Sequence, residues 1–344
     1  MSDAAGAVAK LATKSATAPE ATPPVLEVRD LKTHFAIHHG FLRRAGGKVF
    51  AVDGVSFSIA PRETLGLVGE SGCGKSTVGR TVLRLIEPTA GTIRLDGRDI
   101  THLGKRELRP YRPQMQIIFQ DPFSSLDPRM SAGDIVAEPL RVHGLASGRA
   151  LKEIVAGLFD RVGLRRAQME SFPHQFSGGQ RQRIGIARAL ALQPELIVAD
   201  EPVSALDVSV QAQVLLLLKE LQARRGLAFM FVSHDLGVIR WFCSRVAVMY
   251  LGRIVEQGPV ARVFTTPRHP YTQMLRDASP IPDPSQRGVL PRVVGEIPSA
   301  AAPPPGCHFH PRCPRATELC RTSYPEWREP DGYGFACHHP LEDA

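Results

Sequence analysis

The feature that most constrains this 344-residue chain is a glycine-rich loop that joins an apolar strand to a helix. Residues 64–68 are almost continuously apolar, as expected of a strand buried in a parallel sheet, and residues 77–85 have the pattern of a helix. Glycines let successive backbone amides turn toward phosphate groups, and the following helix adds its positive end. The segment therefore predicts a triphosphate site in an α/β fold. Its residues are Gly69, Ser71, Gly72, Cys73, Gly74, Lys75, Ser76 and Thr77.

Two polar side chains of the loop and two later acids predict the chemistry of this site. Lys75 is expected to reach the β- and γ-phosphates, and the Ser76 hydroxyl to bind Mg²⁺. A second apolar strand, residues 196–199, ends in Asp200 and Glu201, at the sheet edge where the phosphates would lie. We expect Asp200 to hold Mg²⁺ and Glu201 to act as general base toward the attacking water. Purely structural acids would call for a nearby Lys or Arg, and residues 202–205 contain none.

A second anion-binding segment follows about a hundred residues after the loop. Ser177-Gly178-Gly179-Gln180 opens a helix predicted over residues 180–192, and its two glycines leave the first amides of that helix uncovered. Because Lys75 already serves one γ-phosphate, the economical interpretation is that this segment binds ATP held by a second subunit. The sequence thus predicts two subunits that close face to face on nucleotide.

Together these segments resemble the ATP-binding-cassette (ABC) ATPases over residues 25–260. The resemblance implies an α/β P-loop NTPase cassette with a RecA-like parallel core sheet, an antiparallel β layer and a helical subdomain at about residues 121–175. It implies that Gln120 meets Mg²⁺ and the water and that His234 contacts the γ-phosphate. It also implies that Phe35 stacks on adenine, with Phe41 and Phe50 as rivals. The segment expected along the dimer seam is Ser204, Ala205, Leu206 and Asp207.

Longer motifs narrow the resemblance to the ATPase subunits of dipeptide and oligopeptide importers. These motifs are residues 69–77, 120–129, 173–183, 269–272 and 307–314. The resemblance implies that ATP hydrolysis drives uptake of di- or oligopeptides through two membrane permease subunits. It implies a second, homologous ABC ATPase subunit as partner, a solute-binding protein as indirect partner, and a peripheral place on the cytoplasmic face of the inner membrane. Importers of nickel and other small solutes use the same subunit type, so the solute stays open.

Composition agrees with a peripheral protein that binds no nucleic acid. The net charge is +8 and the pI about 9.4, but the arginines are dispersed and no basic block reaches the length of a nucleic-acid-binding arm. No apolar run approaches the ~20 residues that a membrane-spanning helix needs. We expect a disordered leader over residues 1–24, an ATPase domain over 25–260, a Pro-rich connector over 261–306 and a Cys-rich unit over 307–344.

Four of the six cysteines gather near the C-terminus, at Cys307, Cys313, Cys320 and Cys337. Cytosolic proteins seldom keep disulfides, so this grouping favours a metal site. The spacings lack the paired knuckles of zinc ribbons, whereas a [4Fe–4S] cluster takes one cysteine per iron. Some importer ATPases of the resembled type hold such a cluster. The favoured prediction is an iron–sulfur cluster, and a zinc ion or unliganded thiols are the alternatives.

Other ATPase classes fit the sequence less well. A DNA-repair or chromosome-organising ABC ATPase would need a long insertion between the glycine loop and Ser177, and this interval is compact. A cassette-type translation factor would carry two cassettes in one chain, and only one glycine loop occurs in the sequence. A P-loop kinase, which belongs to a different class, has no use for the segment that begins at Ser177.

Overall fold

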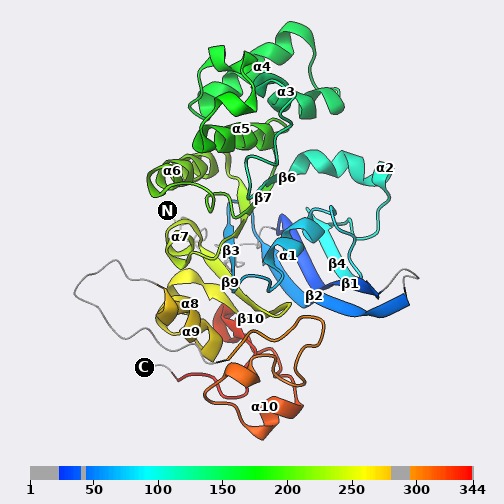
Figure 1. Cartoon of the computed structure of the whole chain (residues 1–344), viewed down its shortest axis with the longest axis vertical. Helices are drawn as coiled ribbons and strands as arrows, with labels where there is room; N and C mark the ends of the chain where they lie inside the picture. The colour runs from blue at the N-terminus through cyan, green and yellow to red at the C-terminus, as the bar shows by residue number, and fades with distance from the viewer. Residues whose placement is uncertain (1–22, 40–43, 280–294, 343–344) are drawn as a thin grey trace, which may run out of the picture.

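The computed structural model describes residues 23–39, 44–279 and 295–342, which form two β-sheets with helices around them (Figure 1). The larger sheet has seven strands in the order β11-β10-β9-β3-β8-β7-β6. Strands β9, β3, β8, β7 and β6 run parallel, whereas β10 and β11 are antiparallel to their neighbours. The strands are β3 Thr64–Val68, β6 Met115–Ile118, β7 Leu196–Asp200, β8 Ala228–Val232, β9 Arg245–Tyr250, β10 Arg253–Pro259 and β11 Gly334–Phe335.

The smaller sheet is antiparallel and has the strand order β2-β1-β4-β5. Its first two strands form a long hairpin in which Phe35 lies opposite Val49. The strands are β1 Leu26–His39, β2 Arg44–Ile59, β4 Ala90–Leu95 and β5 Arg98–Asp99. The predicted parallel core sheet and antiparallel β layer are therefore both confirmed.

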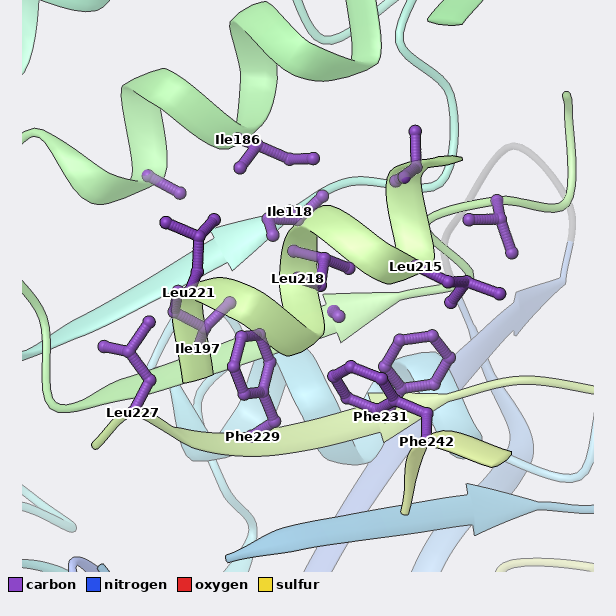
Figure 2. Packing of buried hydrophobic residues seen from close by; sticks show 14 of the residues in the cluster. Ile118, Ile186, Ile197, Leu215, Leu218, Leu221, Leu227, Phe229, Phe231 and Phe242 are labelled. Carbon is purple, nitrogen blue, oxygen red and sulfur yellow. The ribbon is translucent and has the colours of Figure 1, made fainter. Parts of the chain in front are cut away.

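The central strands are apolar except at their ends, because each face of the large sheet is covered. In β8, Phe229 and Phe231 belong to the core on the side of α6 and α7, whereas Met230 and Val232 belong to the core shared with α1 and the small sheet. Figure 2 shows Phe229, Phe231 and Phe242 packed beneath α6. A strand buried on both faces cannot alternate with polar residues, and this explains the uninterrupted apolar runs.

Most helices cover the two faces of the large sheet or form the helical part at one end of the molecule (Figure 1). In that part α5 packs against α3 and α4, so it extends beyond the predicted bounds of 121–175. The longer helices are α1 Lys75–Val82, α3 Ala132–Val142, α4 Gly148–Arg161, α5 Gly178–Leu190, α6 Val208–Arg225, α7 Leu236–Phe242, α8 Val260–Thr265 and α9 Pro270–Ala278. The shorter ones are α2 Lys105–Leu108, α10 Glu318–Thr322, η1 Arg109–Gln114, η2 Arg166–Glu170, η3 Pro173–Gln175, η4 His310–Arg312 and η5 Pro330–Gly332.

The C-terminal residues are attached to the edge of the large sheet. Strand β11 pairs with β10, and the buried Tyr333 donates a hydrogen bond to the buried carboxylate of Glu256. Residues 261–278, assigned above to a connector, form most of α8 and α9. Residues 280–294 of that connector and residues 1–22 of the expected leader lie outside the described residues. Among the helices that the structure describes, none has the length and apolarity to cross a membrane.

Candidate nucleotide site

The glycine loop between β3 and α1 has a backbone that only glycine allows at two positions. Gly69 has a φ of 151°, and an added Cβ would lie 2.2 Å from the Met249 carbonyl oxygen. Gly74 has a φ of 106°, and an added Cβ would lie 2.0 Å from the Ala51 carbonyl oxygen. Real Cβ contacts are never so short, so a side chain at either position would displace the loop from the strands that position it.

Lys75 is the first residue of α1, and its ammonium group turns back onto the loop. Its Nζ donates to the carbonyl oxygens of Gly69, at 2.8 Å, and Glu70, at 3.0 Å. The residue is 5% exposed, so the charge lies within the loop and not in solvent. The buried thiol of Cys73 lies 3.9 Å from the same Nζ, and burial raises the pKa of this thiol. This geometry concentrates positive charge where the sequence predicts phosphates.

The side chains of Ser76 and Asp200 meet at the carboxyl end of β7. Ser76 Oγ donates to Asp200 Oδ1 at 2.7 Å, and the Asp200 side chain is 1% exposed. Arg80 of α1 lies with a guanidinium nitrogen 3.4 Å from Asp200 Oδ2. This arginine is 120 positions from Asp200 in sequence, so the residues next to Asp200 give no sign of it. The hydroxyl and carboxylate oxygens form a pair of ligands that suits Mg²⁺.

Glu201 follows directly, and its carboxylate contacts two other polar side chains. Gln120 donates from Nε2 to Glu201 Oε2 at 2.8 Å, and His234 Nδ1 lies 3.4 Å from Glu201 Oε1. Glu201 has a φ of 45°, in the left-handed region that residues with a Cβ seldom adopt. Its amide donates to the Val232 carbonyl at 3.0 Å, which fixes this turn. The three residues predicted to be catalytic therefore lie together.

A cavity of about 490 Å³ joins the loop to these polar groups. This volume lies within the range of ~300–1,000 Å³ that is usual for small-molecule sites. The lining residues are Val49, Ala51, Ser71, Gly72, Gly74, Lys75, Ser76, Thr77, Gln120, Glu201, His234 and Ala300. Ala300 was not predicted, since no residue pattern in the sequence marks it as part of a nucleotide site.

The end of the cavity beside β2 is where adenine is expected. Phe35 lies opposite Val49, which lines the cavity, and directly opposed residues of an antiparallel pair share one face. Phe35 is 41% exposed and does not itself line the cavity. Phe50 contacts His34 edge-on, and its amide donates to the Ala300 carbonyl at 2.9 Å. Phe41 lies outside the described residues, so Phe35 stays a prediction.

The second anion-binding segment does not reach the cavity of its own chain. Ser177 caps α5: its Oγ accepts a hydrogen bond from the Gln180 amide at 3.4 Å, and the Gln180 side chain accepts one from the Ser177 amide at 3.0 Å. Residues Ser177–Gln180, called the signature segment below, contribute no lining residue to the cavity, and in Figure 1 α5 lies in the helical part, apart from α1. The seam segment, 204–207, also contributes no lining residue.

The C-terminal cysteines converge although they are spread over 31 positions of sequence. Cys307, Cys313, Cys320 and Cys337 line one small pocket, together with His269 and residues near the C-terminus. Burial, reinforced by the neighbouring thiols, raises the pKa of Cys307 to about 11 and that of Cys337 to about 12. Within the described part of the chain, no group of three or more His, Cys, Asp or Glu side chains is arranged to hold a metal ion.

Two sequence families match this chain. The family described as "ABC transporter" matches residues 52–204, which run from β2 through the glycine loop to the start of the seam segment. The family described as "Oligopeptide/dipeptide transporter, C-terminal region" matches residues 255–320, which include three of the four clustered cysteines. The first match contains the glycine loop, Gln120 and Glu201, and the second contains Ala300, whereas His234 lies outside both.

Individual proteins give the same result. The chain is 51% identical over 320 residues to the oligopeptide transport ATP-binding protein AppF of Bacillus subtilis, covering 91% of this chain and 97% of that protein. It is 46% identical to the di/tripeptide transport ATP-binding protein DppF of Pseudomonas aeruginosa, with 92% and 97% covered. Among solved structures it resembles the dimeric structure of MJ0796, a bacterial ABC transporter cassette, with a TM-score of 0.61 at 28% identity. That match covers 68% of this chain and 98% of the cassette.

Proposed function

We propose that this chain, which belongs to the ABC transporter family as an ATP-binding subunit of the peptide transporter type, powers the uptake of di- or oligopeptides as one of two paired ATPase subunits. The prediction of an ATP-hydrolysing cassette is confirmed by these matches. The observation that carries the proposed mechanism is the meeting of Lys75, Ser76, Gln120, Glu201 and His234 in one cavity.

In the proposed reaction the glycine loop and Lys75 bind the phosphates of ATP. The ammonium exchanges its bonds to the Gly69 and Glu70 carbonyls for bonds to the β- and γ-phosphates, beside the positive end of α1. Ser76 and Asp200 offer adjacent oxygen ligands for Mg²⁺, and Gln120 offers an amide oxygen from the same cavity. When bound, Mg²⁺ supplies charge that offsets the negative charge on the phosphate oxygens.

Glu201 is the proposed general base. Its carboxylate accepts the proton of the attacking water, while the hydrogen bond from Gln120 holds Oε2 in place. His234, whose Nδ1 lies beside Oε1, is proposed to contact the γ-phosphate. As Glu201 takes the proton, the water oxygen bonds to the γ-phosphorus and the bond from that phosphorus to ADP breaks. The glycine loop and Lys75 would stabilise the negative charge on the phosphate oxygens during this step.

We further propose that the signature segment Ser177–Gln180 binds the γ-phosphate on a second ATPase subunit. Support comes from its position at the N-terminus of α5, outside the cavity of its own chain. The structure of MJ0796 that the chain resembles is described as dimeric. Two chains joined in this way would close on ATP and open after hydrolysis, and the movement would be passed to the permease subunits.

The proposed cargo and partners follow from the relatives. Peptides are favoured over nickel or another small solute because the matched C-terminal region is that of oligopeptide and dipeptide transporters. A tagged full-length chain, purified from the membranes of cells that produce it, should bring along two multi-span permeases and a second ABC ATPase. The ATPase activity of this complex should rise with di- or oligopeptide and its binding protein, and not with Ni²⁺. Co-purification with ribosomes or DNA would contradict the proposal.

The C-terminal thiols are proposed to hold a [4Fe–4S] cluster as part of a small Cys-rich unit. Support comes from the four cysteines that line one pocket, since such a cluster takes one thiolate per iron, and from spacings that lack the paired knuckles of zinc ribbons. The proposed role of the four residues is to bind the cluster and hold the C-terminal segments together.

Anaerobic purification followed by assays of iron and acid-labile sulfide tests this assignment. The full-length chain should contain about four iron and four sulfide per chain. Cys320→Ser should lower both, whereas Cys243→Ser, which changes a buried cysteine of the ATPase core, should lower neither. Colourless, iron-free wild-type protein would end the cluster assignment.

A further inference from the structure

Glu70 is an acidic residue inside the glycine loop, and its carboxylate is paired with an arginine from the C-terminal part. Arg312 Nη1 lies 2.6 Å from Glu70 Oε2, and Arg312 Nη2 lies 2.9 Å from Glu70 Oε1. The two parallel bonds form a bidentate pair, the strongest geometry for an arginine and a carboxylate. The pair joins residues 242 positions apart in sequence. It therefore ties the phosphate-binding loop to the segment that carries the clustered cysteines.

Arg312 is buried among aromatic rings, so its charge depends on Glu70 for a partner. The Arg312 side chain is 2% exposed and that of Glu70 is 22% exposed. The guanidinium carbon lies 5.9 Å from the ring centres of both Tyr250 and Phe309, and Nε finds no hydrogen-bond acceptor among the described residues. A buried guanidinium needs a carboxylate partner, because leaving the charge unpaired is strongly destabilising. Glu70 provides that partner.

A second C-terminal residue holds the same position of the loop. The Glu70 amide donates to the Tyr271 hydroxyl at 2.9 Å, and Tyr271, on α9, is fully buried. The Tyr271 ring packs against Tyr250 at 4.6 Å and against Phe309 at 5.4 Å between ring centres. The Glu70 carbonyl accepts a bond from Lys75. Backbone and side chain of Glu70 are thus both fixed by residues after position 270.

The charge of Glu70 matters because of where it lies. The next residue, Ser71, lines the nucleotide cavity, and Lys75 contacts the Glu70 carbonyl directly. A free carboxylate in this loop would repel a triphosphate, which carries several negative charges. The bidentate bonds of Arg312 offset that charge without placing the guanidinium in the cavity, whose lining does not include it.

We propose that Arg312 is a positioning residue for nucleotide binding: it neutralises Glu70 and holds the loop in its phosphate-binding shape, so that the C-terminal segment sets the affinity for ATP. This inference rests on the proposed function, since it requires that the cavity binds ATP. It gives a function to two sequence motifs that have no role in the ATPase mechanism: residues 269–272, which contain Tyr271, and residues 307–314, which contain Arg312. Arg312 acts through Glu70 and takes no part in the chemistry at Glu201.

The test compares Arg312→Met with wild type in the full-length chain, by titration with a fluorescent ATP analogue. The Kd should rise roughly ten- to hundredfold, the range expected when a hydrogen-bonded charge loses its partner. The kcat at saturating ATP should stay within about threefold, because Glu201 and its contacts are unchanged. Arg321→Met removes an exposed arginine of α10, whose ion-pair distance to Glu318 is 3.8 Å, and should leave the Kd unchanged.

Two further measurements separate charge neutralisation from a general structural effect. The double variant Glu70→Gln with Arg312→Met should bind the analogue within about threefold of wild type, since neither charge remains. The binding deficit of Arg312→Met should also shrink as salt is raised, because the repulsion is screened. A deficit that the second substitution does not rescue, and that salt does not change, would overturn the proposal.

The remaining outcomes are also decisive. Wild-type affinity in a folded Arg312→Met variant would reject the role of Arg312 and leave the proposed function intact. Failure of the wild-type chain to bind the analogue would reject both. If Arg312→Met does not fold, the double variant Glu70→Gln with Arg312→Met carries the test. Because neither charge remains in it, its Kd should stay within about threefold of wild type, and a Kd raised about tenfold or more would reject the proposal.

Discussion

Replacing Glu201 by glutamine isolates the proposed base from everything else at the site. The glutamine side chain has nearly the same shape, and its amide oxygen can still accept the bond that Gln120 donates to Glu201 at 2.8 Å. The φ of 45° places the same strain on both residues, because each carries a Cβ. The contact between Ser76 and Asp200 is not altered. The substitution therefore removes proton acceptance and little else.

The expected magnitude follows from this isolation. General acid–base catalysis contributes about 10²–10⁴-fold, so kcat should fall by that factor, or ~3–5 kcal/mol in the activation barrier. ATP affinity should stay within about threefold, since Lys75 and the glycine loop bind the phosphates as before. Phosphate release at saturating ATP measures the first quantity, and titration with a nucleotide analogue measures the second. With ATP bound but not cleaved, gel filtration should show a stable pair of subunits.

Glu195 offers a matched control for this substitution. It is an exposed carboxylate immediately before β7, the strand that ends at Asp200, and Glu195→Gln should leave kcat unchanged. Turnover by Glu201→Gln within about threefold of wild type, with ATP binding intact, would refute the general-base role. Loss of ATP binding together with turnover would refute the claim that only proton acceptance was removed.

Three further changes probe other parts of the molecule. Lys75→Ala should raise the Kd for ATP at least about tenfold, because a charge-assisted contact to phosphate is lost, and a fluorescent nucleotide titration measures it. Ser177→Arg should abolish turnover while the Kd for ATP stays unchanged, since Ser177 lies outside its own cavity; a parallel loss of binding would contradict the trans role. Burial tends to raise the pKa of Asp53, but the bond and charge of Arg253, at 2.6 Å, together with His34, lower it overall. This stabilisation is fully present above the unfolded pKa of 3.8 and is lost as the pH falls through the lowered pKa of the folded state. Asp53→Asn should therefore lower the free energy of unfolding by about 1 kcal/mol at pH 7 and by less near pH 3. Urea unfolding at both pH values measures this difference.

The core of the fold could be predicted because its signals are local. The apolar runs at residues 64–68, 196–199 and 229–232 need no partner to be recognised, and each coincides with a strand of the parallel sheet. Helices α8 and α9 lie where the proline content of residues 261–306 predicts a connector. Proline in the first turn of a helix, such as Pro270 in α9, is nevertheless compatible with helix, so proline content alone does not exclude one.

The residues of the nucleotide site also fall into those that the sequence predicts and those that it does not. Residues within contiguous motifs, such as Lys75, Ser76 and Glu201, were predicted and lie together in the structure. Ala300 and Arg80 were missed, because their contacts depend on which distant segments the fold brings to the loop and to β7. Sequence patterns describe the chemistry that a segment offers, whereas the neighbours of that segment are set by the whole tertiary structure.

Gly179 connects the signature segment to the rest of its own chain through close packing. An added Cβ at Gly179 would lie 2.3 Å from Val210 Cγ1, so this glycine is needed for α5 to pack closely on α6 as well as to leave amides free for an anion. Helix α6 is capped by Asp207 at the end of the seam segment, and Ser204 in that segment donates to the Glu201 carbonyl at 3.1 Å. Under the pairing proposed above, these contacts connect the segment that would receive the partner's phosphate to the backbone of this chain's own proposed base, through two closely packed helices.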